Sequence, residues 1–377
     1  MDDPNNTICF LLTTSGWGGL ELNVLKLMSW LGQRGRGAVL YTCADLRVCA
    51  EARIRGLTVC AIPHHRNYFD LCAAYRFSRD LKKQGISRII VCDNRDIDFA
   101  AWTKRFLSPR PTLAFLQQMM VGIDKRDVLH TIRYSALDYW IAPLPWLRDE
   151  ALRKTRIRGD KVRVIPLPVD FAAFTPRRVT KESARASFGI GPVFPLLGIM
   201  GRIDPHKGQL LAVSAVQALR ALGIAAHLLI VGDPTINERA SQLYYDAIKK
   251  KMVADKLEEA VYCRPFMEDP SLFYAAIDIF VMASEGETYG MVTLEAMAAG
   301  IPVIGTNSSG TPELLGNGEF GKLFDKGDCE GLVSRVVEVC ADYGSALQTA
   351  ERAQQRAKET FSHHTVCAQI ERLLNLP

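Results

Sequence analysis

The feature that most constrains the fold is an alternation of apolar runs with segments of helical periodicity, which occurs twice along the chain. The run TICFLLTTS (7–15) precedes three glycines and then a segment (20–35) whose apolar residues recur at helical spacing. A second series begins at PLLGIMGRID (195–204) and continues through similar pairs of runs. Alternation of this kind predicts a parallel sheet covered by helices, and two series predict two doubly wound α/β domains.

The domain boundaries follow from a change in composition. Residues 171–194 (FAAFTPRRVTKESARASFGIGPVF) carry charge and proline with little continuous apolar periodicity, so we interpret them as a linker. We expect a first domain over residues 1–170, a second over residues 171–355 and a final helical segment over residues 356–377. A length of 377 residues agrees with two domains of common size.

Composition limits the cellular setting. No run of about 18 apolar residues occurs, and the N-terminal MDDPNNT does not resemble a secretory signal, so a soluble cytoplasmic protein is expected. The ten cysteines include no C-x-x-C pair and several lie in apolar runs, which favours reduced structural thiols. The histidines show no metal-ligand spacing, so structural or solvated roles are expected for them.

The charge is distributed unevenly along the chain. Residues 1–170 carry 26 Lys and Arg against 17 Asp and Glu, a net charge of +9, whereas residues 171–377 carry 20 against 24, a net charge of −4. A basic first half is compatible with an anionic partner such as lipid headgroups or phosphate, and equally with solvated surface charge. Nucleic acid is the least favoured partner, because few aromatic residues accompany the basic ones and no nucleic-acid motif occurs.

The stretch EGETYGMVTLEAMAAG (285–300) is the clearest candidate for ligand binding. It follows a strand-like run, and in parallel sheets ligands bind beyond the carboxyl ends of the strands. Gly290 opens a helix whose first amides and dipole suit a phosphate, although a tight turn alone also explains the glycine. Glu287 and Glu295 flank that helix start and can accept hydrogen bonds from sugar or ribose hydroxyls. The alternative for Glu295 is an exposed position on the helix.

Two further segments follow strand-like runs. GRIDPHKG supplies Arg202 and Lys207, which could neutralise a diphosphate or could lie solvated on a surface turn. SGWGGLE supplies glycines for close approach to a ligand, with Trp17 and Glu21 as candidate contacts. The chain lacks a G-x-G-x-x-G fingerprint, which argues against a dehydrogenase. It also lacks a phosphate-binding P-loop.

These segments resemble retaining glycosyltransferases of family 4, which adopt the GT-B fold. The resemblance rests on E-x7-E from Glu287 to Glu295, followed by A-M-A-x-G-x-P-V-I, and on the segments GRIDPHKG, SGTPELL (309–315) and SGWGGLELNV. It covers nearly the whole chain and is most specific in the second half. It implies an α/β architecture of two Rossmann-like domains facing a central cleft. The first would bind the acceptor and the second the donor, and the C-terminal helix would cross back to the first.

The resemblance also implies roles for single residues. Arg202 and Lys207 would bind the donor diphosphate and, with Glu287 at the sugar hydroxyls, form the catalytic set. Glu295 would hold the nucleotide ribose. The remaining donor contacts would come from Gly18, Gly19, Tyr289, Gly290, Met291 and Val292. Where the family often has a His near the transferred sugar, this chain has Gln117 or Gln118, so these two join Trp17 and Glu21 as expected acceptor contacts.

Residues and resemblance together predict sugar transfer with retention from a nucleoside-diphosphate sugar to a glycan or lipid-linked acceptor, in cell-envelope polysaccharide or lipopolysaccharide synthesis. Fixed cations would neutralise the leaving diphosphate, so no metal or other cofactor is expected. The basic first half predicts a peripheral contact with an anionic membrane at the inner face of the plasma membrane. Two alternatives stay open: a sugar-nucleotide epimerase of the same fold, and a nucleotide-sugar binding protein without transfer activity.

Overall fold

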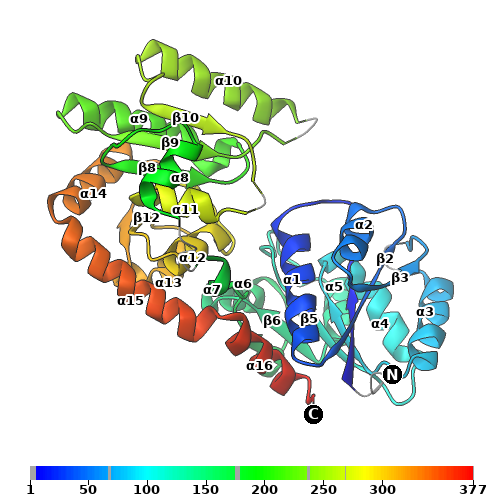
Figure 1. Cartoon of the computed structure of the whole chain (residues 1–377). Coiled ribbons are helices and arrows are strands. Elements are labelled where there is room, and N and C mark those ends of the chain that lie inside the picture. Colours follow the sequence, from blue (N-terminus) through cyan, green and yellow to red (C-terminus); the bar gives the residue numbers. More distant parts are fainter. Residues whose placement is uncertain (1–5, 67–68, 175–178, 236–237, 268, 377) are drawn as a thin grey trace. The chain divides into compact units, whose positions relative to one another are not determined.

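The chain divides into two compact units (Figure 1). The computed structural model describes residues 6–66, 69–174, 179–235, 238–267 and 269–376. The first unit comprises Met1–Pro168 and His363–Pro377, and the second comprises Val169–Ser362. Each unit is a parallel sheet with helices packed on it, as the two alternating series in the sequence predict.

The described part of the first unit contains a sheet of seven strands in the order β3-β2-β1-β4-β5-β6-β7. Its central strands are mostly apolar because helices cover both faces of the sheet, and all five residues of β1 are buried. The strands are β1 Thr7–Leu11, β2 Gly37–Cys43, β3 Thr58–Ile62, β4 Arg88–Val91, β5 Thr112–Leu116, β6 Tyr139–Ala142 and β7 Val162–Val164. The helices are α1 Gly19–Gln33, α2 Arg47–Ile54, α3 Leu71–Lys83, α4 Ile97–Arg105, α5 Val128–Ser135, α6 Pro145–Lys154 and α16 His363–Leu373.

The direction of winding in this sheet reverses between β1 and β4. Both strands run parallel to each other, and Cys9 of β1 lies opposite Val39 of β2 on one side and Ile89 of β4 on the other. At such a switch point the loops after the two strands turn away from each other and leave room for a ligand. A ligand of the first unit is therefore expected beside the segments that follow Leu11 and Val91.

The last helix, α16, is part of the first unit. It packs on α1 through the buried side chains of Val366, Cys367 and Ile370. Arg34 and Glu371 add an ion pair of 2.7 Å, and the neighbouring guanidinium lowers the pKa of the Glu371 carboxyl. The expected final segment began at residue 356, whereas the structure divides at His363, because the preceding helix continues to Phe361 and contacts helices of the second unit.

The described part of the second unit contains a sheet of six strands in the order β10-β9-β8-β11-β12-β13. The strands are β8 Leu196–Met200, β9 His227–Val231, β10 Val261–Arg264, β11 Ile279–Met282, β12 Val303–Thr306 and β13 Lys322–Phe324. The helices are α7 Phe171–Phe174, α8 Lys181–Ser187, α9 Gln209–Ala221, α10 Arg239–Ala254, α11 Ser271–Ala276, α12 Met291–Ala298, α13 Thr311–Leu314, α14 Cys329–Ala341 and α15 Tyr343–Phe361. A core of Ile, Leu, Val and Ala side chains lies between this sheet and helices α9 and α14.

The interpretation of residues 171–194 as a linker is wrong for the part that the structure describes. Helix α8 is capped by Thr180, whose hydroxyl accepts a hydrogen bond from the Ser183 amide, and it packs against α11. Its Arg185 is buried and donates to the Asp278 carboxylate at 2.7 Å. The polar composition of this segment suggested a linker because a sequence does not show that a charged side chain, here Arg185, is buried with its partner inside the unit. Residues 175–178 of the segment lie outside the described residues.

Two expectations from composition can be compared with the structure. The ten cysteines are all free, and four of them, Cys9, Cys43, Cys49 and Cys92, are buried in the first unit together with Cys367. Within the described ranges, no helix combines the length and the apolar character needed to cross a bilayer.

Candidate active site

The turn after β8 contains the two predicted diphosphate ligands. Its 3₁₀ segment Pro205–Lys207 begins with the Asp204 side chain accepting a hydrogen bond from the His206 amide. Gly208 ends the turn with φ +75°, and a Cβ there would lie 2.2 Å from the carbonyl oxygen of Ala283. Only glycine allows the turn to approach the end of β11 this closely. The close approach brings Lys207 to the loop after β11, while Arg202 at the start of the turn is exposed.

Lys207 and Glu287 contact each other directly. The Lys207 ammonium donates to the Glu287 carboxylate at 2.6 Å, and both side chains are partly exposed, at 28% and 18%. The lysine is predicted to bind phosphate and the glutamate to bind sugar hydroxyls, and the structure brings the two side chains into direct contact. An ammonium group can bind a phosphate, and a carboxylate beside it can accept hydrogen bonds from the sugar hydroxyls of the same molecule.

Helix α12 begins beside this pair. Gly290 precedes the helix with φ +92°, and the amides of Thr293 and Leu294 donate to its carbonyl oxygen. The amides of Met291 and Val292 open the helix, where the peptide dipoles leave a partial positive charge. A Cβ on Gly290 would lie 3.3 Å from the Cγ of Glu287, so the glycine lets the loop fold back over the helix start. Tyr289, next to it, is buried.

Glu295 lies one turn into α12 and is held by Tyr274, whose role is not visible in the sequence. The Tyr274 hydroxyl lies 3.0 Å from the Glu295 carboxylate and 3.0 Å from the Val292 carbonyl oxygen. Burial raises the pKa of Tyr274 well above its usual value, so the hydroxyl stays protonated and can donate. Glu295 is therefore an oriented, half-buried carboxylate rather than a solvated helix residue.

The glycine loop of the first unit leads into α1. The Gly18 amide donates to the Glu21 carboxylate at 2.8 Å, and Glu21 is buried. A carboxylate in this position satisfies an amide at the helix start, so Glu21 stabilises the loop that carries Gly18 and Gly19. Trp17 is half-buried and lies under the guanidinium of Arg47, 4.9 Å from its ring centroid.

A cavity of about 290 Å³ lies at the carboxyl ends of β4 and β5 in the first unit. Gln117 and Gln118 both line it, together with Asn94, Arg95, Lys125 and Trp140. Gln117 is held in place, because its Oε1 accepts a hydrogen bond from the Trp140 indole at 2.8 Å and its Nε2 donates to the Met119 carbonyl. The Nε2 of Gln118 is buried and has no hydrogen-bond partner among the described residues, so it can donate to a ligand.

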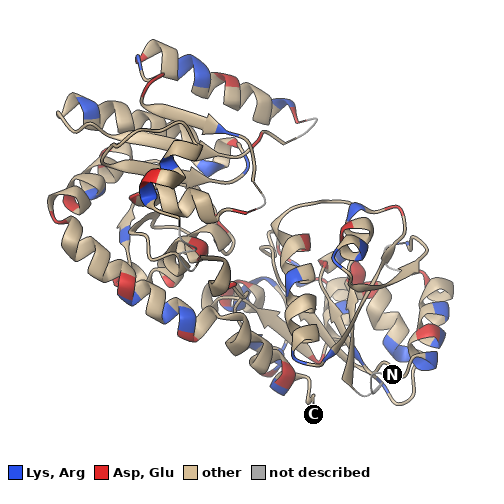
Figure 2. Cartoon of the chain, in the orientation of Figure 1, with Lys and Arg blue, Asp and Glu red and all other residues tan. Residues whose placement is uncertain are grey.

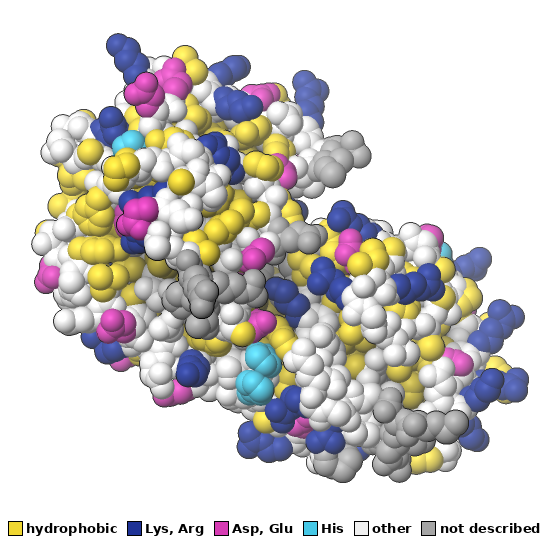
Figure 3. Space-filling view, viewed as in Figure 1, with side chains coloured by type: hydrophobic (Ala, Val, Ile, Leu, Met, Phe, Trp, Pro, Cys, Tyr) yellow, Lys and Arg dark blue, Asp and Glu magenta, His cyan; other side chains and the backbone are white. Residues whose placement is uncertain are grey.

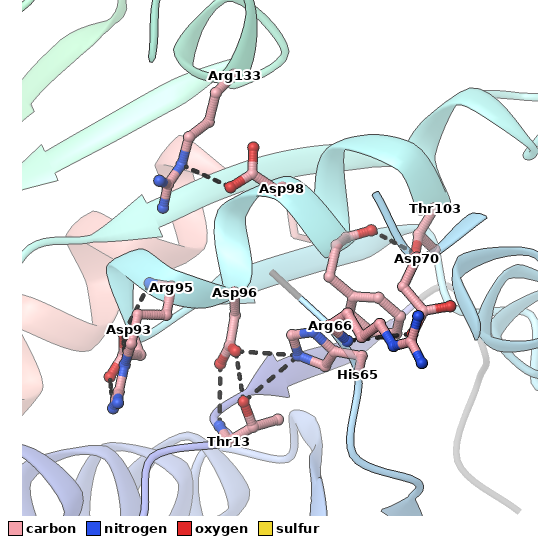
Figure 4. Close-up of polar contacts among 11 residues, drawn as sticks. Thr13, His65, Arg66, Asp70, Asp93, Arg95, Asp96, Asp98, Thr103 and Arg133 are labelled. Atoms are coloured by element: carbon pink, nitrogen blue, oxygen red, sulfur yellow. Dashed lines mark hydrogen bonds and ion pairs between the residues drawn. The ribbon is translucent and has the colours of Figure 1, made fainter. Parts of the chain in front are cut away.

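A polar network connects Thr13, which follows β1, with His65 and Asp96 (Figure 4). The amide and hydroxyl of Thr13 both donate to the Asp96 carboxylate, the amide at 2.9 Å. His65 Nε2 lies 3.2 Å from the same carboxylate, and its ring stacks on Phe99 at 4.1 Å between centroids. The sequence indicates no role for Asp96, and it predicts structural or solvated roles for the histidines. The network ties the segments after β1, β3 and β4 together just before the glycine loop.

The site residues thus form one set in each unit. In the second unit, Lys207, Glu287, Glu295 and the start of α12 lie at the carboxyl ends of β8 and β11. In the first unit, Gln117 and Gln118 line the cavity, while Trp17, Gly18, Gly19 and Glu21 form the loop and first turn of α1. In the ranges that the structure describes, no group of three or more His, Cys, Asp and Glu residues could hold a metal ion.

A family comparison matches the part of the chain that contains the site residues of the second unit. Residues 180–360 match the family model Glycosyl transferases group 1, a range that spans most of the second unit. The second unit is therefore similar to this family over most of its length, and we call it the group 1 domain. The turn with Lys207, the loop with Glu287 and all of α12 fall inside the matched range of this group 1 domain.

The curated relatives that match this chain include glycosyltransferases with different named roles. The lipopolysaccharide core biosynthesis glycosyltransferase LpsE of Rhizobium meliloti is 30% identical over 172 residues, which are 46% of this chain and 47% of the relative. A D-inositol 3-phosphate glycosyltransferase of Pseudarthrobacter chlorophenolicus is 35% identical over 218 residues, 56% of this chain and 50% of the relative. The chain spans about half the length of the curated relatives it matches.

Solved structures establish the fold over both units. HepE of Anabaena in complex with UDP matches with a TM-score of 0.86 at 20% identity, covering 98% of this chain and 99% of that one. The same protein in complex with UDP-glucose matches with a TM-score of 0.80. The predicted GT-B fold of two Rossmann-like units is therefore confirmed, with the group 1 domain as its second unit.

Proposed function

We propose that the protein is a retaining glycosyltransferase that moves a sugar from a nucleoside-diphosphate sugar to a glycan or lipid-linked acceptor. The observation that carries the proposal is the Lys207–Glu287 pair at the amino end of α12, inside the group 1 domain. A relative in lipopolysaccharide core biosynthesis supports a role in envelope polysaccharides. A cytoplasmic location remains part of the proposal. The HepE complexes with UDP and UDP-glucose make uridine donors the first to test.

In this proposal the donor diphosphate replaces Glu287 as the partner of Lys207. The donor diphosphate lies against the amides of Met291 and Val292 and takes the ammonium of Lys207, with Arg202 closing on its outer oxygens. Glu287 then turns to the hydroxyls of the sugar, and Glu295 accepts from the ribose. Because both Lys207 and Glu287 are partly exposed, this exchange needs no buried charge to be left unpaired.

Catalysis follows from the charge that develops on the diphosphate. As the bond between the sugar C1 and the phosphate oxygen breaks, the leaving diphosphate becomes more negative, and fixed cations and amides stabilise it. The acceptor hydroxyl forms a new bond to C1 on the same face, and its proton passes to the departing phosphate oxygen. Retention of configuration results, and the neutralisation needs no metal ion.

The acceptor would enter the cavity of the first unit. The free donor of Gln118 and the Gln117 amide, held by Trp140, suit hydroxyl groups of a sugar. Gly18 and Gly19 remain proposed contacts of the donor, and Trp17 remains a proposed contact of the acceptor. Glu21 enters this proposal as the residue that holds the glycine loop.

A donor panel tests the proposal. The full chain is mixed with UDP-, GDP-, ADP- and TDP-sugars, and the melting temperature and the release of nucleotide are measured with and without lipid-linked and soluble sugar acceptors. We expect one donor to raise the melting temperature and to react only with acceptor, giving an anomer of unchanged configuration by NMR, also in EDTA. Conversion of the donor sugar to an epimer without acceptor, or binding without any transfer or hydrolysis, would replace the proposal by one of its two alternatives.

The hydroxyl of Tyr274 provides a prediction about the ribose contact. Tyr274→Phe removes a hydrogen bond to a carboxylate, a contact of about 1.5–3 kcal/mol, and frees Glu295 to rotate. We expect a roughly tenfold or greater rise in the donor KM with a smaller change in kcat. The control is Tyr343→Phe, which loses a hydrogen bond to the Asp278 carbonyl in the same unit. Equal donor KM values for the two variants would show that Tyr274 does not position Glu295.

A further inference from the structure

The cavity of the first unit, at the carboxyl ends of β4 and β5, has an aromatic wall. Phe115, Tyr134 and Trp140 all line it. The Trp140 ring meets the other two edge-on, at 5.0 and 5.1 Å between ring centroids. Aromatic rings offer an apolar surface on which the C–H groups of a sugar ring can pack. Because such packing does not discriminate by charge, the polar groups of the wall decide what else the ligand carries.

The side-chain oxygens of this wall already accept hydrogen bonds. In addition to Gln117 with the Trp140 indole, the acceptors and their donors are Asp93 with Arg95 at 2.8 Å, Asn94 with Tyr134 at 3.4 Å and Gln118 with Asn23 at 3.4 Å. The unused donors of the described wall include the buried Nε2 of Gln118 and the ammonium of Lys125. The wall therefore suits a ligand that is rich in hydrogen-bond acceptors.

Lys125 supplies an uncompensated charge to the same wall. The residue is half-buried, and its backbone is fixed because its amide donates to the Lys154 carbonyl oxygen at 2.8 Å. Its ammonium forms no hydrogen bond or ion pair with any residue that the structure describes. The other two charged residues that line the cavity, Asp93 and Arg95, pair with each other. The net charge of the described lining is therefore the charge of Lys125.

The nearby carboxylate of Glu150 has other partners. Glu150 is 2% exposed and accepts hydrogen bonds from the Val121 amide at 3.0 Å and from the Lys154 ammonium at 2.9 Å. A buried carboxylate with these donors is already neutralised by one lysine. Glu150 is thus not available as a direct partner of Lys125.

Arg133 adds positive charge near Lys125. Its side chain is 5% exposed, and its Nε lies 3.3 Å from the Asp98 carboxylate (Figure 4). Its Nη2 is buried without a hydrogen-bond partner among the described residues. Burial lowers the pKa of Lys125, the charge of Arg133 lowers it further, and Glu150 acts in the opposite direction. An anion beside the Lys125 ammonium would compensate for both the burial and the repulsion.

Basic side chains on the helices of the first unit have a different environment. Arg76, Lys82 and Lys83 of α3 are exposed. Figure 2 shows the basic positions along α3, and Figure 3 shows basic side chains projecting at that edge of the unit. Water and salt screen such charges, whereas a charge in a half-buried cavity acts through a medium of lower dielectric constant. Lys125 is therefore better placed than these residues to distinguish a charged ligand from a neutral one.

We propose that the acceptor carries a carboxylate or a phosphate group and that Lys125 binds this group in the cavity. Gln118 Nε2 donates to a neighbouring oxygen of the same sugar, whose C–H groups pack on Trp140. The inference rests on the proposed function, because it names the class of acceptor that the site selects. A neutral sugar leaves the half-buried ammonium without a counter-charge, so it binds more weakly than its charged counterpart.

The test compares sugars that differ only at C6. Methyl glycosides of glucose, galactose and mannose are used, each as the neutral sugar, the 6-carboxylate and the 6-phosphate. Binding to the full chain is measured by calorimetry without donor, and the acceptor KM is measured with the donor that the donor panel identifies. We expect a charged member of at least one series to bind about tenfold or more tightly than its neutral parent. Whether the carboxylates or the phosphates bind more tightly identifies the group.

Variants of Lys125 assign the preference to its ammonium. Lys125→Gln should bind the charged sugar about tenfold or more weakly and the neutral sugar almost unchanged. Lys125→Arg keeps the charge and should keep the preference. The matched control Lys26→Gln loses the same charge at an exposed position of α1 and should bind like the unaltered chain. Melting temperatures report on folding, and the comparison of charged with neutral sugars on the unaltered chain stands even if Lys125→Gln fails to fold.

The outcomes separate this inference from the proposed function. Equal binding of charged and neutral sugars, equal losses in Lys125→Gln and Lys26→Gln, or no binding of any of these sugars would overturn the anionic acceptor. Transfer from a bound donor to neutral and charged sugars with equal KM would overturn it while sugar transfer stands. Binding of charged sugars that depends on Lys125, in a chain that neither binds nor uses a donor, would retain the anion site and remove the proposed function.

Discussion

Replacing Lys207 by alanine is expected to lower kcat by about 10²–10³-fold, the effect of removing one group that stabilises transition-state charge. The geometry gives the reason, since the Lys207 ammonium lies 2.6 Å from Glu287 and beside the first amides of α12, where the leaving diphosphate would gain charge. The fold should be unaffected, because the side chain is partly exposed and its ion pair contributes little to stability. Single-turnover rates with saturating donor measure the effect.

The control for this prediction is Lys322→Ala. Lys322 forms an ion pair with Glu338 at 3.3 Å in the same unit, at the first residue of β13 and so at the opposite end of the sheet from Lys207. It should retain the rate of the unaltered chain. If Lys207→Ala transferred sugar as fast as Lys322→Ala, the lysine would not stabilise the leaving group, and the proposed mechanism would have to be abandoned.

The site residues of the second unit were easier to predict from the sequence than those of the first unit. Its ligand-binding segments are short stretches directly after strands, and two of the glycines that position them, Gly208 and Gly290, have positive φ. Such glycines and the charged residues beside them are visible in the sequence without knowledge of the packing. The contact between Lys207 and Glu287, which are 80 residues apart, required the structure.

The interactions that the sequence did not reveal are those made by side chains with more than one plausible environment. Tyr274 belongs to an apolar helix and looks like a core residue, yet its hydroxyl holds Glu295. Asp96 and His65 are separated by 31 residues, and only the order of the strands brings them together at Thr13. Arg185 looked like part of a solvated linker because a sequence pattern cannot indicate that a charge is buried with its partner.

The largest effect on stability is expected for Asp278→Ala. Asp278 is buried and accepts hydrogen bonds from Lys181 at 2.8 Å, from Arg185 at 2.7 Å and from the Leu196 amide at 2.8 Å. Its removal leaves the buried guanidinium of Arg185 without a counter-charge, which costs about 3–5 kcal/mol of unfolding free energy. The loss falls where α8 meets the strands β8 and β11, so it destabilises the second unit directly.

The distribution of tryptophan allows this loss to be assigned to one unit. All five tryptophans precede residue 169, so their fluorescence follows the first unit, whereas far-UV circular dichroism follows both. In guanidinium, Asp278→Ala should move the circular-dichroism transition to lower denaturant and leave the tryptophan transition nearly in place. The control Glu338→Ala removes an exposed carboxylate paired with Lys322 and Arg335, and should change the unfolding free energy by less than about 1 kcal/mol. If Asp278→Ala lowered the unfolding free energy as little as this control does, Arg185 would not need the Asp278 carboxylate. Its hydrogen bonds to the carbonyl oxygens of Ala276 and Val193 would then suffice to hold α8.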